Sequence, residues 1–166
     1  MKKIVSKAAS SKTLYLMRGP SGTGKSTMAK TLGAEAVFSA DNFFTNEDGT
    51  YAFDSSKIAQ AHGQCKALTE DALKKGISPV AVDNTFTQRF ELKPYVEMAR
   101  RYGYNVEFVE PNWSPNLRHP DGKWNADFIE EMQNSAERVK ANKSLPRNVI
   151  DKMVNRYQYD LNPEDF

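Results

Sequence analysis

The chain has 166 residues, of which 39% are hydrophobic, and its 23 Lys and Arg nearly balance its 21 Asp and Glu at a net charge of +2. This length predicts one domain over residues 1–166 that buries a core without disulfide or metal staples. Cys65 is the one cysteine, which excludes an internal disulfide and fits a reducing, cytoplasmic compartment. No apolar run approaches the ~18 residues of a membrane span, so we expect no membrane contact.

Positive charge is unevenly distributed along the chain. Residues 1–12 begin with basic residues and lack a long apolar core, so they make a poor signal peptide and predict a basic arm or a first strand. No acid precedes Glu35, and residues 138–147 contain four basic residues and no acid. Two basic regions in a near-neutral chain favour phosphate-bearing ligands, although for any single lysine a solvated helix face is the better explanation.

A strand candidate at residues 13–18 leads into GPSGTGKS at residues 19–26, which fits the Walker A spacing G-x-x-x-x-G-K-[ST]. Phosphate oxygens need several backbone N–H groups that converge on one point, and glycines allow the necessary tight loop. A helix at 26–32 would add the positive end of its dipole. The predicted nucleotide-binding residues are Gly19, Ser21, Gly22, Thr23, Gly24, Lys25, Ser26 and Thr27. Lys25 is expected at the terminal phosphates, and Ser26 is expected to ligate Mg²⁺.

Further apolar runs alternate with helical patterns along the chain. The remaining strand candidates are residues 36–39, 79–83 and 105–109. A helix is expected after Asp54 as its N-cap, with Gly76 at its end. A second helix over 87–103 contains Pro94, where it either begins or kinks. This alternation predicts a parallel sheet with helices on both faces.

Beyond the fourth strand candidate the composition changes. The segments are a loop rich in Pro, Asn and Gly at 111–123, a polar helix at 124–142, a closing helix at 146–157 with Pro146 at its first position, and a loose tail at 158–166. We expect residues 111–145 to form a loop and lid region that covers the bound phosphates and excludes water.

Acids stand where two of the predicted strands end. Asp41 follows the second strand, and Asp83 closes the third. The carboxyl ends of parallel strands meet at one edge of a sheet, where ligands collect. We expect Asp83 to organise Mg²⁺ and Asp41 to take the proton of an acceptor hydroxyl. The alternatives are an N-cap or turn residue for Asp41 and a cap of the next helix for Asp83.

A phosphoryl transferase also needs a cation over the transferred group, because negative charge spreads over that group in the transition state. The basic segment 138–147 is the candidate after the fourth strand. Arg138 and Lys140 are the predicted catalytic lid residues, with Lys143 and Arg147 behind them.

Together, GPSGTGKST, FSADNFF, YAFD, SPVAVDNT and LKPYVEMARRYGYNVEFVEP resemble the P-loop polynucleotide 5′-hydroxyl kinase family, of the phage polynucleotide kinase type. The resemblance covers residues 13–110 and resumes at 135–157. It implies an α/β three-layer sandwich, with a four-stranded parallel sheet in the order 2-3-1-4 and a helical lid. It also implies transfer of the ATP γ-phosphate, with Mg²⁺, to the 5′-hydroxyl of a single-stranded or end-exposed nucleic acid, with Asp41 as the general base.

The sequence departs from the family on the acceptor side. The phage enzyme has an arginine three residues after its base, and Phe44 stands at that position here. The predicted substrate-binding residues are therefore Phe44, Asn84, Thr85, Gln88 and Arg89, and Phe43, Phe86 and Trp113 are candidates for either base stacking or core packing. Two other functions stay open, namely a small-molecule P-loop kinase and a nucleotide-gated nucleic-acid-binding module.

Overall fold

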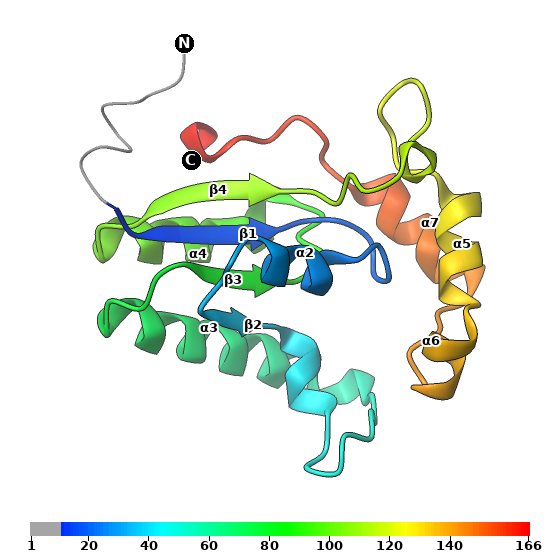
Figure 1. The fold of residues 1–166 in the computed structure, drawn as a ribbon, viewed down its shortest axis with the longest axis horizontal. Helices are drawn as coiled ribbons and strands as arrows, with labels where there is room; N and C mark the ends of the chain where they lie inside the picture. The colour runs from blue at the N-terminus through cyan, green and yellow to red at the C-terminus, as the bar shows by residue number, and fades with distance from the viewer. Residues whose placement is uncertain (1–10) are drawn as a thin grey trace.

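The computed structural model describes residues 11–166, and these contain a four-stranded parallel sheet between layers of helices (Figure 1). The strands are β1 (Thr13–Met17), β2 (Ala36–Phe38), β3 (Val80–Asp83) and β4 (Asn105–Val109). They lie in the order β2-β3-β1-β4, and every pair is parallel, which confirms the predicted fold. Apart from residues 11 and 12, the predicted basic arm or first strand lies outside the described residues.

The two central strands are apolar because both of their faces are covered. Their fully buried side chains are Leu14, Leu16, Met17, Val80, Ala81 and Val82. Near-continuous apolar runs of this kind are typical of parallel strands between two helix layers. None of the helices in residues 11–166 has the length and hydropathy of a transmembrane segment.

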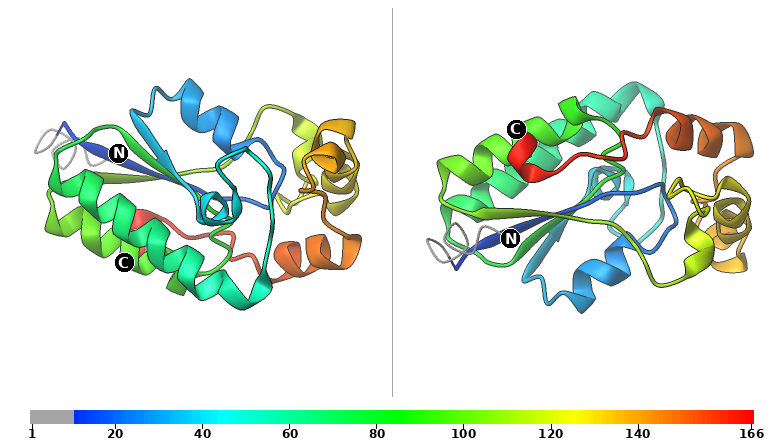
Figure 2. Two further views of the ribbon diagram at one scale, coloured as in Figure 1. Left: turned by 90° about the horizontal axis from the view of Figure 1, so that it is seen from below. Right: turned by 90° about the horizontal axis from the view of Figure 1, so that it is seen from above.

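Three layers are visible when the sheet is seen along its edge (Figure 2). Helix α2 (Lys25–Thr31) covers one face, where Ala29 packs with Met17 and Ala81. Helices α3 (Ile58–Lys74) and α4 (Arg89–Arg101) cover the other face and enclose the largest core cluster. The sheet therefore presents all of its carboxyl ends at one edge, beside the loop between β1 and α2.

The helix boundaries follow local capping chemistry. The Asp54 carboxylate accepts a hydrogen bond from the Ser56 N–H and caps a 3₁₀ turn (Ser55–Lys57) that leads directly into α3. The Glu91 carboxylate accepts hydrogen bonds from the Gln88 N–H and the Thr87 hydroxyl at the start of α4. Helix α4 begins at Arg89 and runs through Pro94, which lies in its second turn, so the expectation that the helix begins at that proline is wrong.

The lid consists of a 3₁₀ turn (Pro115–Leu117) and the helices α5 (Ala126–Gln133), α6 (Ala136–Lys140) and α7 (Arg147–Arg156). The single helix expected over 124–142 is divided, because Asn134 ends α5 and the Ser135 hydroxyl caps α6. The sequence predicted Pro146 as the first residue of the closing helix. In the structure Pro146 is instead the N-cap, and α7 begins one residue later at Arg147.

The lid has a core of its own, formed by Leu117, Trp124, Ile129, Ile150, Met153 and Tyr157. The Arg147 guanidinium joins α5 to α7 through ion pairs with Asp127, Glu130 and Asp151. Arg147 therefore holds the lid together, which explains its place in the basic segment without a catalytic role.

The expectation of a loose tail at 158–166 is wrong. The Gln158 N–H donates to the Thr87 carbonyl at 2.7 Å, and the Arg89 N–H donates to the Gln158 side chain. The Phe166 ring meets Phe108 edge to face at 5.7 Å, and the Arg89 guanidinium lies 4.1 Å from its centroid. The tail thus covers β4 and the start of α4 (Figure 2).

Arg18 connects three parts of the fold. It follows β1 directly and is 1% exposed. Its Nε donates to the Phe86 carbonyl at 3.0 Å, and its Nη2 donates to the Gln158 carbonyl at 2.9 Å. Its guanidinium also lies 4.4 Å from the Tyr157 ring centroid. One buried cation therefore joins the end of β1, the loop after β3 and the tail.

We expect Arg18→Met to lower the free energy of unfolding by about 2–4 kcal/mol, because the buried Phe86 carbonyl and the partly buried Gln158 carbonyl lose a charged donor. Urea denaturation measures this loss. Arg101→Met is the matched control, since Arg101 forms an exposed ion pair with Glu70 and such pairs contribute little. Equal losses in the two variants would contradict the role assigned to Arg18.

Candidate active site

The phosphate loop joins β1 to α2 and needs glycine at defined positions. Gly22 and Gly24 have φ values of 83° and 90°, in the left-handed region that favours glycine. The Thr23 hydroxyl donates to the Pro20 carbonyl at 2.7 Å and closes the loop from inside. Ser26 and Thr27 are exposed in the first turn of α2, where the helix dipole favours an anion.

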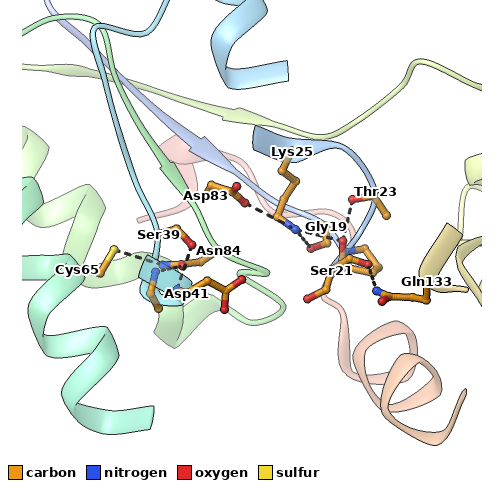
Figure 3. Close-up of polar contacts among 12 residues, drawn as sticks. Gly19, Ser21, Thr23, Lys25, Ser39, Asp41, Cys65, Asp83, Asn84 and Gln133 are labelled. Atoms are coloured by element: carbon orange, nitrogen blue, oxygen red, sulfur yellow. Dashed lines mark hydrogen bonds and ion pairs between the residues drawn. The ribbon is translucent and has the colours of Figure 1, made fainter. Parts of the chain in front are cut away.

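Lys25 lies inside this loop. Its Nζ donates to the carbonyls of Gly19 and Pro20, at 2.9 and 3.1 Å, and lies 3.8 Å from Asp83 Oδ1 (Figure 3). Burial lowers the pKa of Lys25, and the charges of Asp83 and Asp41 oppose that shift. Burial likewise raises the pKa of Asp83, and Lys25 opposes it. Each charge is therefore maintained mainly by the opposite charge beside it.

Asp41 lies in the 3₁₀ turn (Ala40–Phe44) that follows β2. The cap of this turn is Ser39, whose hydroxyl accepts a hydrogen bond from the Asp41 N–H at 3.1 Å, so the Asp41 carboxylate is not used as the cap. The carboxylate is directed toward the phosphate loop (Figure 3). Its charge acts on Lys25, Asp83 and Arg138, which brings the predicted base and the predicted metal ligand to one site.

Tyr51 is a neighbour of Asp41 that sequence reasoning did not select. Its hydroxyl donates to Asp41 Oδ1 at 3.3 Å. Burial and the negative charge of Asp41 raise the pKa of Tyr51 to about 12, so the phenol stays protonated and remains a donor near neutral pH. Lys143 Nζ lies 5.4 Å from the centroid of the Tyr51 ring, and the Asn142 amide donates to the Tyr51 carbonyl, so the lid contacts the residue that donates to Asp41.

Arg138 belongs to the lid helix α6 and lies beside the phosphate loop. Its Nε donates to Gln133 Oε1 at 3.1 Å, and its Nη2 donates to the Lys143 carbonyl at 3.0 Å. Burial lowers the pKa of Arg138, and Asp41 is the largest opposing influence. Lys140, the second predicted lid residue, is exposed on α6. The lid lysine whose charge acts on Asp83 is Lys143 instead.

Gln133 is a second residue that sequence reasoning missed. It is fully buried, and its Nε2 donates to the Ser21 carbonyl at 2.6 Å. Its Oε1 accepts hydrogen bonds from Arg138 and from the Leu145 N–H. Gln133 therefore connects the phosphate loop to the lid and orients the lid arginine. A glutamine in a polar helical stretch gives no sequence signal for such a role.

Trp113 forms one wall of a cavity of about 400 Å³ beside the phosphate loop, with Gly22, Gly24, Thr27, Met28 and Thr31 as its other walls. Its indole N–H donates to the Thr23 carbonyl at 2.9 Å, while 57% of the side chain is exposed. The size is within the ~300–1,000 Å³ of small-molecule sites. The sequence left two hypotheses for Trp113, base stacking and core packing. The exposed ring beside the cavity favours a contact with a ligand over core packing.

The predicted acceptor-side residues divide into several groups. Phe44 is 6% exposed and packs against Phe43 and Phe53, so the expectation that its ring contacts substrate is wrong. A core aromatic at the end of a strand has the same sequence pattern as an exposed one. Asn84 is also largely buried, and its Oδ1 accepts a hydrogen bond from the Ala40 N–H, which fixes the turn that carries Asp41.

The remaining candidates are Thr85, Gln88 and Arg89. Thr85 supports the phosphate loop, because its carbonyl accepts a hydrogen bond from the Gly19 N–H at 3.0 Å. The Gln88 backbone takes part in the start of α4, and Arg89 is exposed there with its guanidinium on Phe166.

Mg²⁺ is the metal that the motif implies. Residues 11–166 contain no cluster of three or more His, Cys, Asp or Glu side chains that could hold a metal ion. Mg²⁺ characteristically uses one or two protein ligands and completes its shell with waters and substrate phosphates. The exposed Ser26 hydroxyl and the Asp83 carboxylate beside Lys25 fit that requirement.

A family model described as an AAA domain matches residues 14–119, which is more than half of the chain. The chain therefore belongs to this family of P-loop domains. The match includes the phosphate loop, Asp41, Asp83 and Trp113, and it ends before the lid helices.

Among curated proteins, the chain is 38% identical over 103 residues to NEDD4-binding protein 2 from Homo sapiens, which covers 60% of this chain and 6% of that protein. It is 31% identical over 103 residues to the 2′,3′-cyclic-nucleotide 3′-phosphodiesterase from Rattus norvegicus, which covers 60% of this chain and 24% of that protein. The chain thus spans less than a quarter of the length of these relatives.

Among solved structures, a chain of the Pnkp1/Rnl/Hen1 RNA repair complex matches with a TM-score of 0.66. The match covers 93% of this chain and 46% of that chain at 19% sequence identity. At this identity the likeness concerns the fold alone, and it agrees with the order of strands described above.

We expect Gly22→Ala to lower the free energy of unfolding by about 1–3 kcal/mol more than Gly49→Ala. The two glycines have nearly equal φ values of 83° and 85°, so both variants carry similar backbone strain. A Cβ at Gly22 would lie 2.8 Å from Gln133 Nε2, whereas a Cβ at Gly49 has no neighbour within 4 Å. Urea denaturation compares the variants, and equal losses would argue against a close contact between loop and lid.

Proposed function

We propose that this protein is an ATP-dependent kinase that transfers the γ-phosphate of ATP to the 5′-hydroxyl end of a DNA or RNA strand. The observation that carries the proposal is the direction of the Asp41 carboxylate, which faces the space beside Lys25 and Asp83 (Figure 3). Phosphoryl transfer needs a carboxylate at that point, because the acceptor hydroxyl must be oriented and must lose its proton.

The donor side of the proposal rests on the phosphate loop. Backbone N–H groups of residues 21–27 are suited to the phosphates of ATP, and Lys25 supplies a positive charge beside them. Trp113 offers an exposed ring face to the adenine in the adjoining cavity. Ser26 and Asp83 would hold Mg²⁺, which would neutralise charge on the phosphates.

The chemistry on the acceptor side balances with the residues in place. The 5′-oxygen forms a bond to the γ-phosphorus, the bond to the bridging oxygen of ADP breaks, and the hydroxyl proton passes to Asp41. Tyr51 keeps the Asp41 carboxylate oriented through its hydrogen bond. Arg138 is held by Gln133 near the loop, where it can stabilise the charge of the transferred group.

One comparison supports a nucleic-acid acceptor, because a chain of similar fold is part of an RNA repair complex. The relative named for 2′,3′-cyclic nucleotides supports a nucleotide-related substrate without separating a strand from a small molecule. The basic residues Arg138, Lys140 and Lys143 on the lid are consistent with a strand of phosphates that leads to the site.

An acceptor panel with γ-labelled ATP tests the proposal. We expect label transfer to oligonucleotides with a 5′-hydroxyl and none to the same oligonucleotides with a 5′-phosphate. Equal transfer to a free nucleoside would favour a small-molecule kinase. Tight ATP-dependent binding of oligonucleotides without transfer would favour a binding module.

We expect Asp41→Asn to lower kcat for 5′-phosphorylation by roughly 10²–10⁴-fold, with little change in ATP affinity, because an amide cannot accept the proton. Steady-state kinetics and ATP titration measure the two effects. Asp48→Asn is the control, since Asp48 is an exposed acid in the next turn of the chain whose hydrogen bonds are local and go to Thr50. Undiminished turnover in Asp41→Asn would remove Asp41 from the reaction.

The lid gives a second matched pair. We expect Arg138→Gln to lower kcat by roughly 10²–10³-fold, since it removes a preorganised donor from the transferred group. Lys140→Gln should leave kcat within about twofold, because Lys140 is exposed on the same short helix and surface changes have small effects. The reverse order of effects would restore Lys140 as the catalytic lid residue.

A further inference from the structure

A second cavity, of about 240 Å³, lies between α3 and α4. His62 and Lys66 of α3, Phe90 and Glu91 of α4, and Asn84 and Phe86 of the loop after β3 contribute to its walls. Its volume is below the ~300–1,000 Å³ of sites for whole drug-sized ligands, so it suits a single planar group.

The contacts of Asn84 show that this cavity lies next to Asp41, the candidate general base. The residue directly follows Asp83, its side chain lines the cavity, and its Oδ1 accepts a hydrogen bond from the Ala40 N–H at 3.0 Å. Ala40 precedes Asp41, and Figure 3 shows Asn84 between Asp41 and the α3 residue Cys65. The cavity therefore lies at the same edge of the sheet as Asp41, on the side away from the phosphate loop.

The aromatic side chains of the cavity are not explained by core packing alone. Phe90 is 70% exposed, the largest value among the exposed large hydrophobic residues in the described part of the chain. Phe86 has a φ of 46°, a conformation that is costly for a bulky residue and that occurs most often at functional sites. The Phe86 ring is buried edge to face against Tyr95 at 5.4 Å, so its strained backbone fixes one cavity wall.

Polar groups complete the cavity. Lys66 is exposed and His62 is half-buried on the α3 wall. On the opposite wall, Glu91 Oε1 accepts hydrogen bonds from Thr87 and Gln88, so this carboxylate is held in place as the cap of α4. An exposed aromatic face with a lysine beside it is the combination that binds single-stranded nucleic acid, through base stacking and phosphate contact.

We infer that the cavity between α3 and α4 binds the 5′-terminal nucleobase of the acceptor strand while its 5′-hydroxyl lies at Asp41. Phe90 stacks on the base, and Lys66 contacts the phosphate that follows the first nucleoside. The inference rests on the proposed function and identifies its acceptor subsite.

The test compares short 5′-hydroxyl oligonucleotides with and without a base on the first nucleoside. We expect kcat/KM to be about tenfold higher for the base-bearing acceptor, because the stacking of one base on an aromatic ring stabilises a complex by a factor of this order. In Phe90→Ala this ratio should fall to about one, through loss with the base-bearing acceptor only. Leu68→Ala, which removes an exposed side chain from α3 outside the cavity, should keep the wild-type ratio.

Lys66 gives a second arm. Lys66→Ala should raise KM by a similar factor for both acceptors, whereas Lys74→Ala, at the other end of α3, should not. Equal kcat/KM for the two acceptors in the wild type, or an equal loss in Phe90→Ala, would overturn the inference while leaving the kinase intact. Absence of transfer to any oligonucleotide would overturn the proposed function, and the acceptor subsite with it.

Discussion

A lysine ammonium buried in a loop of carbonyls, with one carboxylate beside it, is the constraint around which this molecule is organised. Burial disfavours the charges of both Lys25 and Asp83, and each is stabilised by the other. Asp41 and Arg138 add one further charge of each sign to the site, and Asp41 opposes the effect of burial on Arg138. These groups come from the phosphate loop, two strand ends and the lid, and the parallel sheet is what brings them to one edge. Because the charges are already oriented, little reorganisation is needed when charge develops on a transferred group.

The loop and the lid behave as one unit through Gln133. Its amide contacts the Ser21 carbonyl, Arg138 and the Leu145 N–H, so one buried side chain uses both its donor and its acceptor to connect them. A buried amide with satisfied partners specifies its surroundings strongly, since any displacement leaves a polar group unpaired. The position of Arg138 is therefore determined as much by Gln133 as by the helix on which it lies.

Much of this arrangement was predictable from the sequence. The strand candidates, the Walker A spacing and the acids at the strand ends predicted a parallel sheet and the meeting of Asp41 with Asp83, because these features depend on local patterns and on the geometry of parallel sheets. The order of the strands came from the resemblance to the P-loop kinase family and not from these patterns. The sequence predicted Lys140 as the lid lysine near the site, whereas the structure has Lys143 there. The positions of both lysines depend on a break at Ser135 and on Asn142, whose φ of 59° turns the chain back. The ordered tail was missed because its partners are distant in sequence and leave no periodic signal. Gln133 was missed for the same reason.

The buried guanidinium of Arg18 has a consequence for how the two halves of the site communicate. Arg18 is adjacent to the first glycine of the phosphate loop, and it holds the carbonyl of Phe86, the strained residue in the wall of the second cavity. One buried side chain thus connects the phosphate loop to the wall of the second cavity without passing through Lys25, Asp83 or Asp41. Under the proposed function, a change that one substrate transmits through Arg18 to the affinity for the other must be matched by an equal change in the reverse direction.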